Sequence, residues 1–428
     1  MTDPDRLSAD DAHILSVESD VITGHTLKLI VLEPGPAPMD IDHLRSEVAR
    51  RLPSQPRAMQ RVDTSGPEPR WVVATDFDIR YHVRRFSGGD CVSQTDLWRI
   101  VSTLMTEHLD RSRPLWTFDL IGPLADGREA IAVRIHHAMT DGIAGIRFLD
   151  ALLWDPLDPA SWSAPPTGLR SATSEPSRIA QARRMPAAVV RELGHPGSRS
   201  PFDRPICIAR ELAFTVASLA EMKAIGDSRP VHATVNDVLL AIVAGGLRSW
   251  LGDSGALAPH LHAQVPVSLH HRDERPDDLG NRDSFLNVDL PLGEQNPLLR
   301  LDLIAAETRK RKRLGDAQEL YDLFHALGRI KYLGSAVERL AGNAREFSLS
   351  ISNVPGPPAP VSVVGRPVQH LFDSSEPAAH HALRISAVSC AGQVGIGMCT
   401  DPNALPGVAL LADAIDDSYA EFRSAAIR

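Results

Sequence analysis

Residues 131–142 read Ile-Ala-Val-Arg-Ile-His-His-Ala-Met-Thr-Asp-Gly. The first five positions are mostly branched or small apolar residues, which is typical of a strand. Asp141 stands where a helix N-cap is expected, and Gly142 permits a close turn. The apolar residues of 143–154 follow with helical spacing. This segment therefore predicts a strand, a tight loop and a helix, in that order.

Two adjacent histidines, His136 and His137, lie between the strand and the loop. Successive strand side chains point to opposite faces, so the two rings face opposite ways if the strand continues through them. One ring can then enter a cleft while the other packs behind it. An imidazole with a pKa of about 6.5 can take a proton from an alcohol at neutral pH. Asp141 can brace the loop through a hydrogen bond or an ion pair with an arginine from elsewhere.

Two other interpretations of the pair remain open. Both histidines can be structural, and the pairs at 270–271 and 380–381, which lack the following Asp-Gly, show that two histidines alone mean little. Metal binding is the second alternative. Strand alternation separates the two rings, and no third cluster of strong ligands accompanies them, so we expect no metal site.

Strands and helices alternate along the rest of the chain. We expect strands at 26–32, 116–121, 130–135, 263–268, 285–290, 348–353, 382–389 and 394–400, and helices at 40–52, 97–109, 143–154, 236–251, 298–313 and 406–425. Gly392 to Gly397 falls between two of these strands and precedes no helix, so it predicts a hairpin and no dinucleotide site. This interleaving predicts an α/β class built of α+β layers.

The chain has 428 residues, which suits more than one domain. A stretch rich in Pro, Ser, Gly and Arg, residues 161–205, predicts a linker with one short helix at 185–193. It separates an N-terminal half, 1–160, from a C-terminal half, 206–428.

Composition excludes several classes of protein. The net charge of −9 argues against a surface that follows nucleic acid. The four cysteines form no C-x-x-C pair, so zinc ribbons and thioredoxin-like sites are not expected. There is no signal-peptide pattern, and the longest apolar run worth testing, 238–247, is shorter than the roughly 20 residues that span a bilayer. We expect a cytoplasmic protein, soluble or peripheral on a membrane.

The pattern His136-His137-x-x-x-Asp141-Gly142, after a strand and before a helix, resembles the signature of the chloramphenicol-acetyltransferase-like acyltransferases. Further elements resemble the bacterial wax ester synthase/diacylglycerol acyltransferase family within that superfamily. They are Leu7-Ser-Ala-Asp-Asp-Ala-His-Ile-Leu15, Pro114-Leu115-Trp116, Asn236-Asp237, Pro266-Val-Ser268, Leu279-Gly-Asn281, Asp289-Leu-Pro291 and Ser352-Asn-Val-Pro-Gly-Pro357. The ordered matches run from about Leu7 to Phe422.

The resemblance implies two pseudo-symmetric halves with an active-site tunnel between them. Acyl-CoA, as co-substrate, and a lipid alcohol would enter from different faces, and no cofactor is implied. His137 would deprotonate the acceptor hydroxyl, which would attack the thioester directly, with no covalent enzyme intermediate. The product would be triacylglycerol from diacylglycerol, or wax ester from a long-chain alcohol. Such an enzyme would work in the cytoplasm or at the surface of membranes or lipid inclusions.

The resemblance also implies supporting roles. His136 and Asp141 complete the catalytic set with His137. The expected substrate-binding positions are Pro114, Leu115, Trp116, Gly142, Asn236, Asp237, Asn281, Ser352 and Asn353. Asn281, Ser352 and Asn353 are candidate donors toward an oxyanion. The alternatives are packing for 114–116, helix capping for 236–237 and turn chemistry for the remaining polar positions.

The chain departs from the family pattern around its second half. The linker is short, residues 202–210 lack the expected Asn-Gly-Pro, and Glu376 to Arg384 replaces a Gly-rich loop. Cys390 stands where an aromatic residue is common. These changes leave the identity of the acceptor alcohol undetermined. The alternatives to a lipid acyltransferase are the same chemistry on a natural-product or sterol-like hydroxyl, and a lipid-binding relative without activity.

Overall fold

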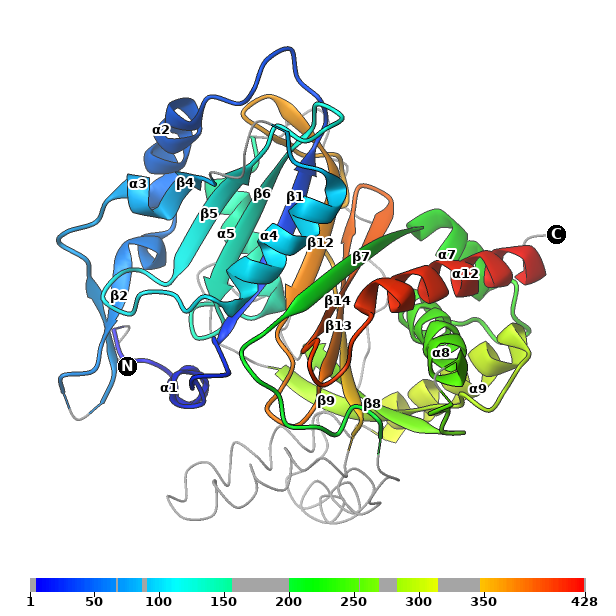
Figure 1. Cartoon of the computed structure of the whole chain (residues 1–428). Helices are drawn as coiled ribbons and strands as arrows, with labels where there is room; N and C mark the ends of the chain where they lie inside the picture. The colour runs from blue at the N-terminus through cyan, green and yellow to red at the C-terminus, as the bar shows by residue number, and fades with distance from the viewer. Residues whose placement is uncertain are drawn as a thin grey trace.

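The computed structural model describes residues 5–66, 68–86, 91–155, 200–253, 255–268, 283–314 and 347–426. Two lobes lie side by side, each built on a six-stranded sheet (Figure 1). Helices and strands mix in both, as the α/β interpretation predicts. The expected helix at 185–193 and most of the predicted linker lie outside the described residues.

The first sheet has the order β11-β12-β1-β6-β5-β4. Its strands are β11 (Ser362–Val363), β12 (Arg366–Ser375), β1 (His25–Leu32), β6 (Glu129–His136), β5 (Trp116–Ile121) and β4 (Val83–Arg85). The elements around it are α1 (Ala9–Ser16), α2 (Ile41–Arg51), α3 (Ile79–His82), α4 (Gln94–Thr106), α5 (Gly142–Leu152), the 3₁₀ turns at Leu52–Ser54 and Pro56–Met59, and a small hairpin of β2 (Gln60–Asp63) and β3 (Arg70–Val73).

Side-chain alternation along β1 gives this sheet two separate cores. Leu27, Leu29 and Val31 pack with the apolar side of α4. Ile30 and Leu32 point the other way, into the core that holds α5. Because both faces are covered, β1 and β6 are buried along their whole length. The loop that leaves β6 therefore starts from a rigid strand.

The second sheet has the order β7-β14-β13-β10-β8-β9. Its strands are β7 (Glu211–Ser218), β14 (Gln393–Thr400), β13 (Leu383–Cys390), β10 (Leu349–Val354), β8 (Leu261–Ser268) and β9 (Asp283–Leu290). The helices of this lobe are α7 (Leu219–Asp227), α8 (Val235–Asp253), α9 (Pro297–Leu314) and α12 (Val408–Ala426). Residues of α8, α9 and α12 share one apolar core with the strands.

The first lobe contains two strands from the C-terminal half of the sequence. Strands β11 and β12 come late in the sequence, yet they belong to the first sheet, where β12 pairs with β1. The boundary between 1–160 and 206–428 therefore does not coincide with the boundary between the sheets. Figure 1 shows β12 between the lobes, where it also packs on β13 and β14.

Two glycines permit this packing. A Cβ at Gly395 would lie 2.1 Å from the carbonyl oxygen of Leu371, and one at Gly397 would lie 2.2 Å from that of Asp373. Any side chain there would push β12 away from β14. The Gly-rich stretch thus continues the hairpin of β13 and β14, which confirms the hairpin prediction and explains its glycines.

Candidate active site

The loop after β6 is fixed by backbone hydrogen bonds on both sides. The His136 N–H donates to the carbonyl oxygen of Leu115 at 3.0 Å, and the His137 N–H donates to that of Gly24 at 2.9 Å. The Asp141 carboxylate caps α5 by accepting from the Ala144 N–H at 2.8 Å, and its residue is 4% exposed. The predicted order of strand, loop and capped helix is therefore confirmed.

His136 is enclosed and has both ring nitrogens occupied. Its Nε2 lies 2.7 Å from Glu18 Oε1, and its Nδ1 accepts the Ala138 N–H at 3.0 Å. Because Nδ1 accepts, the proton of the neutral ring sits on Nε2 and is donated to Glu18. Burial raises the pKa of Glu18, but the hydrogen bond from His136 and the charge of Arg111 together bring it below its usual range.

His137 is partly exposed, unlike its neighbour. Its pKa is lowered to about 3, first by burial of the ring and then by the positive charge of Arg384, with smaller electrostatic contributions from His136 and Lys28. A hydrogen bond between the ring and the backbone of Thr140 opposes this shift. The ring is therefore neutral at pH 7. One nitrogen is held by Thr140, and the other is in the form that can accept a proton.

A buried ion pair lies beneath the loop. Lys28 Nζ is 2.8 Å from Asp373 Oδ1, and both residues are almost fully buried. They face each other because Lys28 of β1 and Asp373 of β12 are partners in the sheet register. A Cβ at Gly145 of α5 would approach Lys28 Cε to 3.2 Å, so the lysine lies directly against the helix that follows the loop.

The second lobe also reaches the loop. A Cβ at Gly142 would lie 2.8 Å from Val354 Cγ2, at the end of β10. Arg384 of β13 contributes the largest charge effect on the pKa of His137. The candidate site is therefore formed where the first turn of α5 meets β10 and β13 of the other sheet.

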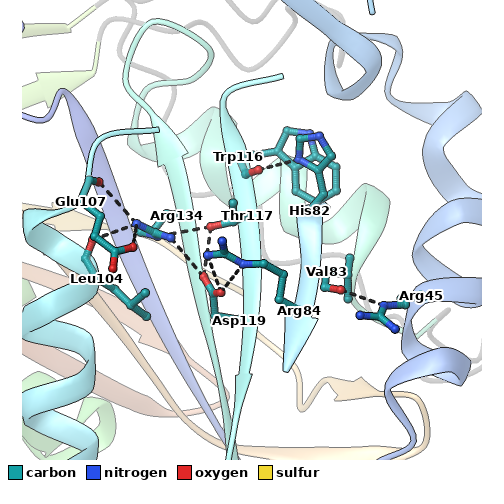
Figure 2. A network of polar contacts seen from close by, with 10 residues as sticks. All are labelled: Arg45, His82, Val83, Arg84, Leu104, Glu107, Trp116, Thr117, Asp119 and Arg134. Carbon is teal, nitrogen blue, oxygen red and sulfur yellow. Dashed lines mark hydrogen bonds and ion pairs between the residues drawn. The ribbon is translucent and has the colours of Figure 1, made fainter. Parts of the chain in front are cut away.

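A polar network supports β6 from the α4 side (Figure 2). Arg134, two residues before His136, is buried and bonds to Thr117 Oγ1 at 3.3 Å and to the Leu104 carbonyl at 3.0 Å. Its Nη2 lies 3.4 Å from Asp119 Oδ2, and Arg84 binds the other oxygen of the same carboxylate. The network joins β6 to β5, β4 and the end of α4, so it stiffens the strand that carries the histidines.

The Pro114-Leu115-Trp116 element lies next to the loop but in the core. Trp116 is fully buried, donates its indole N–H to the Ala58 carbonyl at 2.8 Å, and packs against Phe118 and Phe148. Leu115 supports His136 through its carbonyl. The described contacts of these residues are packing contacts and hydrogen bonds within the protein, and their contact with substrate stays a prediction.

The remaining predicted substrate-binding positions that the structure describes lie at the start of α8 and near the end of β10. Asp237 opens α8, where it accepts from the Thr234 N–H at 2.8 Å and from Thr308 Oγ1 at 2.6 Å. This geometry is that of a helix cap, and Asn236 lies beside it, partly exposed. Ser352 and Asn353 precede Val354 in β10, and the side chain of Val354 lies beside Gly142. Asn281 lies outside the described residues.

Sequence reasoning missed several residues around the loop: Glu18, Gly24, Lys28, Glu376 and the contribution of Arg384. The sequence could have indicated a role for Lys28, because a charged residue inside an otherwise apolar strand needs a buried partner of opposite charge. Gly24, with φ of +73°, precedes a strand and marks a special backbone position. The neighbouring residues of Glu18 and Glu376 do not indicate their roles, because their hydrogen-bond partners are far away in the sequence.

Family comparisons cover most of the chain. The model of the wax ester synthase/diacylglycerol acyltransferase catalytic domain matches residues 7–195, and that of the family's C-terminal domain matches residues 279–423. A candidate diacylglycerol O-acyltransferase of Mycobacterium tuberculosis is 32% identical, over 83% of this chain and 77% of the relative. A second candidate from that species is 28% identical, over 92% of this chain and 89% of its own length.

Solved structures with the same fold include a wax ester synthase/diacylglycerol acyltransferase from Marinobacter aquaeolei, at 23% identity with a TM-score of 0.75. The alignment covers 99% of this chain and all of that one. The starter condensation domain of rhizomide synthetase, solved with C8-CoA and Leu-SNAC, aligns over 99% of this chain and 94% of its own at a TM-score of 0.61 and 13% identity. By sequence and by fold, the chain belongs to the wax ester synthase/diacylglycerol acyltransferase family.

Proposed function

We propose that the protein transfers a fatty acyl group from acyl-CoA to the hydroxyl of a lipid alcohol, with His137 as general base. The observation that carries the proposal is the pair of contrasting histidines. His136 is walled in and bonded at both nitrogens, whereas His137 is partly exposed at the meeting point of the two lobes. Membership in the family supports acyl transfer to oxygen, with acyl-CoA as donor.

In the proposed reaction, the ring nitrogen of His137 that does not contact Thr140 takes the proton of the acceptor hydroxyl. The hydroxyl oxygen attacks the thioester carbonyl carbon, and the C–S bond then breaks. The proton on His137 passes to the departing CoA thiolate, so atoms and charge balance over the cycle. Because a ring with a low pKa is a weak base, we expect proton transfer to accompany attack of the oxygen.

The charge near the ring suits this reaction. Arg384 and Lys28 lower the pKa of His137 through their positive charge. The same charge favours a tetrahedral intermediate, whose former carbonyl oxygen is negative. Ser352 or Asn353 is proposed as a hydrogen-bond donor to that oxygen, since β10 ends at the loop and consecutive side chains of a strand point to opposite faces. The reaction needs neither a metal nor a prosthetic group.

The proposed acceptors are diacylglycerol, which gives triacylglycerol, and long-chain alcohols, which give wax esters. None of the helices in the described part of the chain is both long and apolar enough to cross a membrane. Because the proposed acceptors are lipids, we propose that the enzyme meets them by peripheral association with a membrane or a lipid inclusion.

The test is a product assay with labelled palmitoyl-CoA. The acceptor panel contains a diacylglycerol, hexadecanol, a sterol and a small polar alcohol, and products are separated by thin-layer chromatography. We expect labelled triacylglycerol or wax ester. Turnover with the sterol or polar alcohol alone would reject the lipid acceptors proposed here. Binding of acyl-CoA without transfer to any acceptor would indicate a lipid-binding relative.

A further inference from the structure

The carboxylate of Glu376, far from the histidines in the sequence, binds the backbone of Gly24, whose carbonyl oxygen accepts the His137 N–H. Glu376 Oε1 accepts the Gly24 N–H at 2.6 Å, and Oε2 accepts the Thr23 N–H at 2.8 Å. The Thr23 hydroxyl adds a third hydrogen bond at 3.2 Å. Thr23 is fully buried and Glu376 is 8% exposed, so water competes little for these bonds.

The sheet register brings Glu376 to this place. Strand β12 ends at Ser375, which pairs with Thr26 in the antiparallel register. Glu376, the first residue after β12, therefore lies beside the segment that precedes Thr26 in the chain. Its carboxylate is anchored in turn by the side chain of Arg210, whose Nη2 lies 3.6 Å from Oε2 and also donates to the Val21 carbonyl.

Gly24, held by Glu376, contacts both histidines of the loop. Its carbonyl oxygen accepts the His137 N–H at 2.9 Å. Its Cα lies so close to His136 that a Cβ would come within 2.3 Å of Nε2. A shift of Gly24 would therefore move the backbone of His137 and release the ring of His136 together.

We propose that Glu376, braced by Arg210, is a positioning residue that fixes His137 for proton transfer by holding Thr23 and Gly24. This inference rests on the proposed function for its effect on rate. It also gives a role to part of the segment from Glu376 to Arg384, where the chain departs from the Gly-rich loop of its family.

Glu129 provides a matched control. It is 1% exposed, accepts the Met39 N–H at 2.7 Å, and pairs with Arg366 at 2.5 Å. It therefore resembles Glu376 as a buried carboxylate held between a backbone N–H and an arginine. It lies at the opposite end of β6 from the histidines.

The experiment compares Glu376→Gln with Glu129→Gln in the full chain. Glutamine keeps one acceptor oxygen but places an NH₂ group against the second donor. We expect both variants to lower the melting temperature. Only Glu376→Gln is expected to lower kcat, by about tenfold, with KM for palmitoyl-CoA unchanged, because misplacement of a catalytic group by about 1 Å can cost up to about 100-fold. Equal kcat values for the two folded variants would overturn the proposal.

Amide hydrogen exchange of the 131–142 segment gives a readout that needs no turnover. We expect the His137 N–H to exchange at least about tenfold faster in Glu376→Gln than in the wild type or in Glu129→Gln, because its acceptor is no longer held. Unchanged exchange would contradict the proposal even if the acyltransferase assay fails. If Glu376→Gln does not fold, Glu376→Asp, which retains the charge beside Arg210 but shortens the reach, is compared in the same way.

Discussion

His136 Nε2 lies 2.7 Å from Glu18 Oε1, and this contact separates the tasks of two histidines that are adjacent in the sequence. The ring of His136 has no remaining nitrogen for a substrate proton, because Nδ1 accepts from Ala138. The carboxylate of Glu18 also pairs with Arg111. The first histidine therefore holds the loop in place, and we propose that the second meets the substrate.

Replacement of His136 by alanine is expected to weaken the fold more than the chemistry. The substitution removes a fully buried ring and leaves Glu18 short of a donor, which we expect to cost about 2–4 kcal/mol in the free energy of unfolding. Urea denaturation measures that loss, and kcat is measured at a temperature where the variant is folded. A stable His136→Ala protein without turnover, beside an active His137→Ala protein, would reverse the two roles.

The low pKa of His137 predicts an unusual pH profile. A general base is active when unprotonated, so lowering its pKa to about 3 extends activity toward acid. We expect kcat/KM to stay flat from about pH 8 to about pH 5, as long as the protein is folded. An acid limb centred at about 6.5, the ordinary value for histidine, would show that the ring is more hydrated than its surroundings indicate.

Because Lys28 and Asp373 form a buried ion pair, we expect a single variant to lose much more stability to unfolding than the double variant. Lys28→Met leaves the Asp373 carboxylate buried without its cation, at a cost of about 3–5 kcal/mol. Lys28→Met combined with Asp373→Leu removes both charges and is expected to recover most of this loss. Urea unfolding of the two variants and the wild type provides the comparison. Equal stability of the single and double variants would show that the pair is not coupled.

Gly142→Ala tests the contact between the lobes. The new Cβ would meet Val354 Cγ2 at 2.8 Å, so α5 or β10 must move. We expect a loss of about 1–2 kcal/mol in stability and a lower kcat.

The control for this variant is Gly252→Ala in α8, where a Cβ meets nothing within 4 Å. We expect that variant to gain about 0.5–1 kcal/mol from the better helix propensity of alanine, with kcat unchanged. If Gly142→Ala behaved like Gly252→Ala, close packing of the lobes at the loop would not matter for turnover.

The sequence predicts the elements that carry the motif because their local signals agree. Apart from Arg134, residues 130–135 are branched or small apolar residues, Asp141 is a good cap, and the helix after it has one apolar side. The strand is observed as Glu129–His136 and the helix as Gly142–Leu152. The end of a strand or helix is harder to predict. The helix expected at 97–109 runs from Gln94 to Thr106, because Ser93 and Asp96 form a capping box before the first apolar residue.

The missed elements depend on distant partners. Strand β12 contains Pro367, and polar residues interrupt its apolar pattern, so alternation alone does not reveal it. Its place in the first sheet depends on β1, more than 300 residues earlier. Strand β7 has a better signal in Leu212, Phe214 and Val216, which alternation could have found. No sequence motif marks Glu376, because its contact with Gly24 depends on the register between β1 and β12.

Replacement of His137 by alanine is the decisive test of its role as general base. The variant keeps the backbone N–H that donates to Gly24, so the loop retains its anchor. We predict that acyl transfer from palmitoyl-CoA falls by about 10²–10⁴-fold, the usual contribution of a general base, while the melting temperature barely changes. An unaltered transfer rate in the folded variant would contradict the general-base mechanism, because the hydroxyl would then lose its proton to another group.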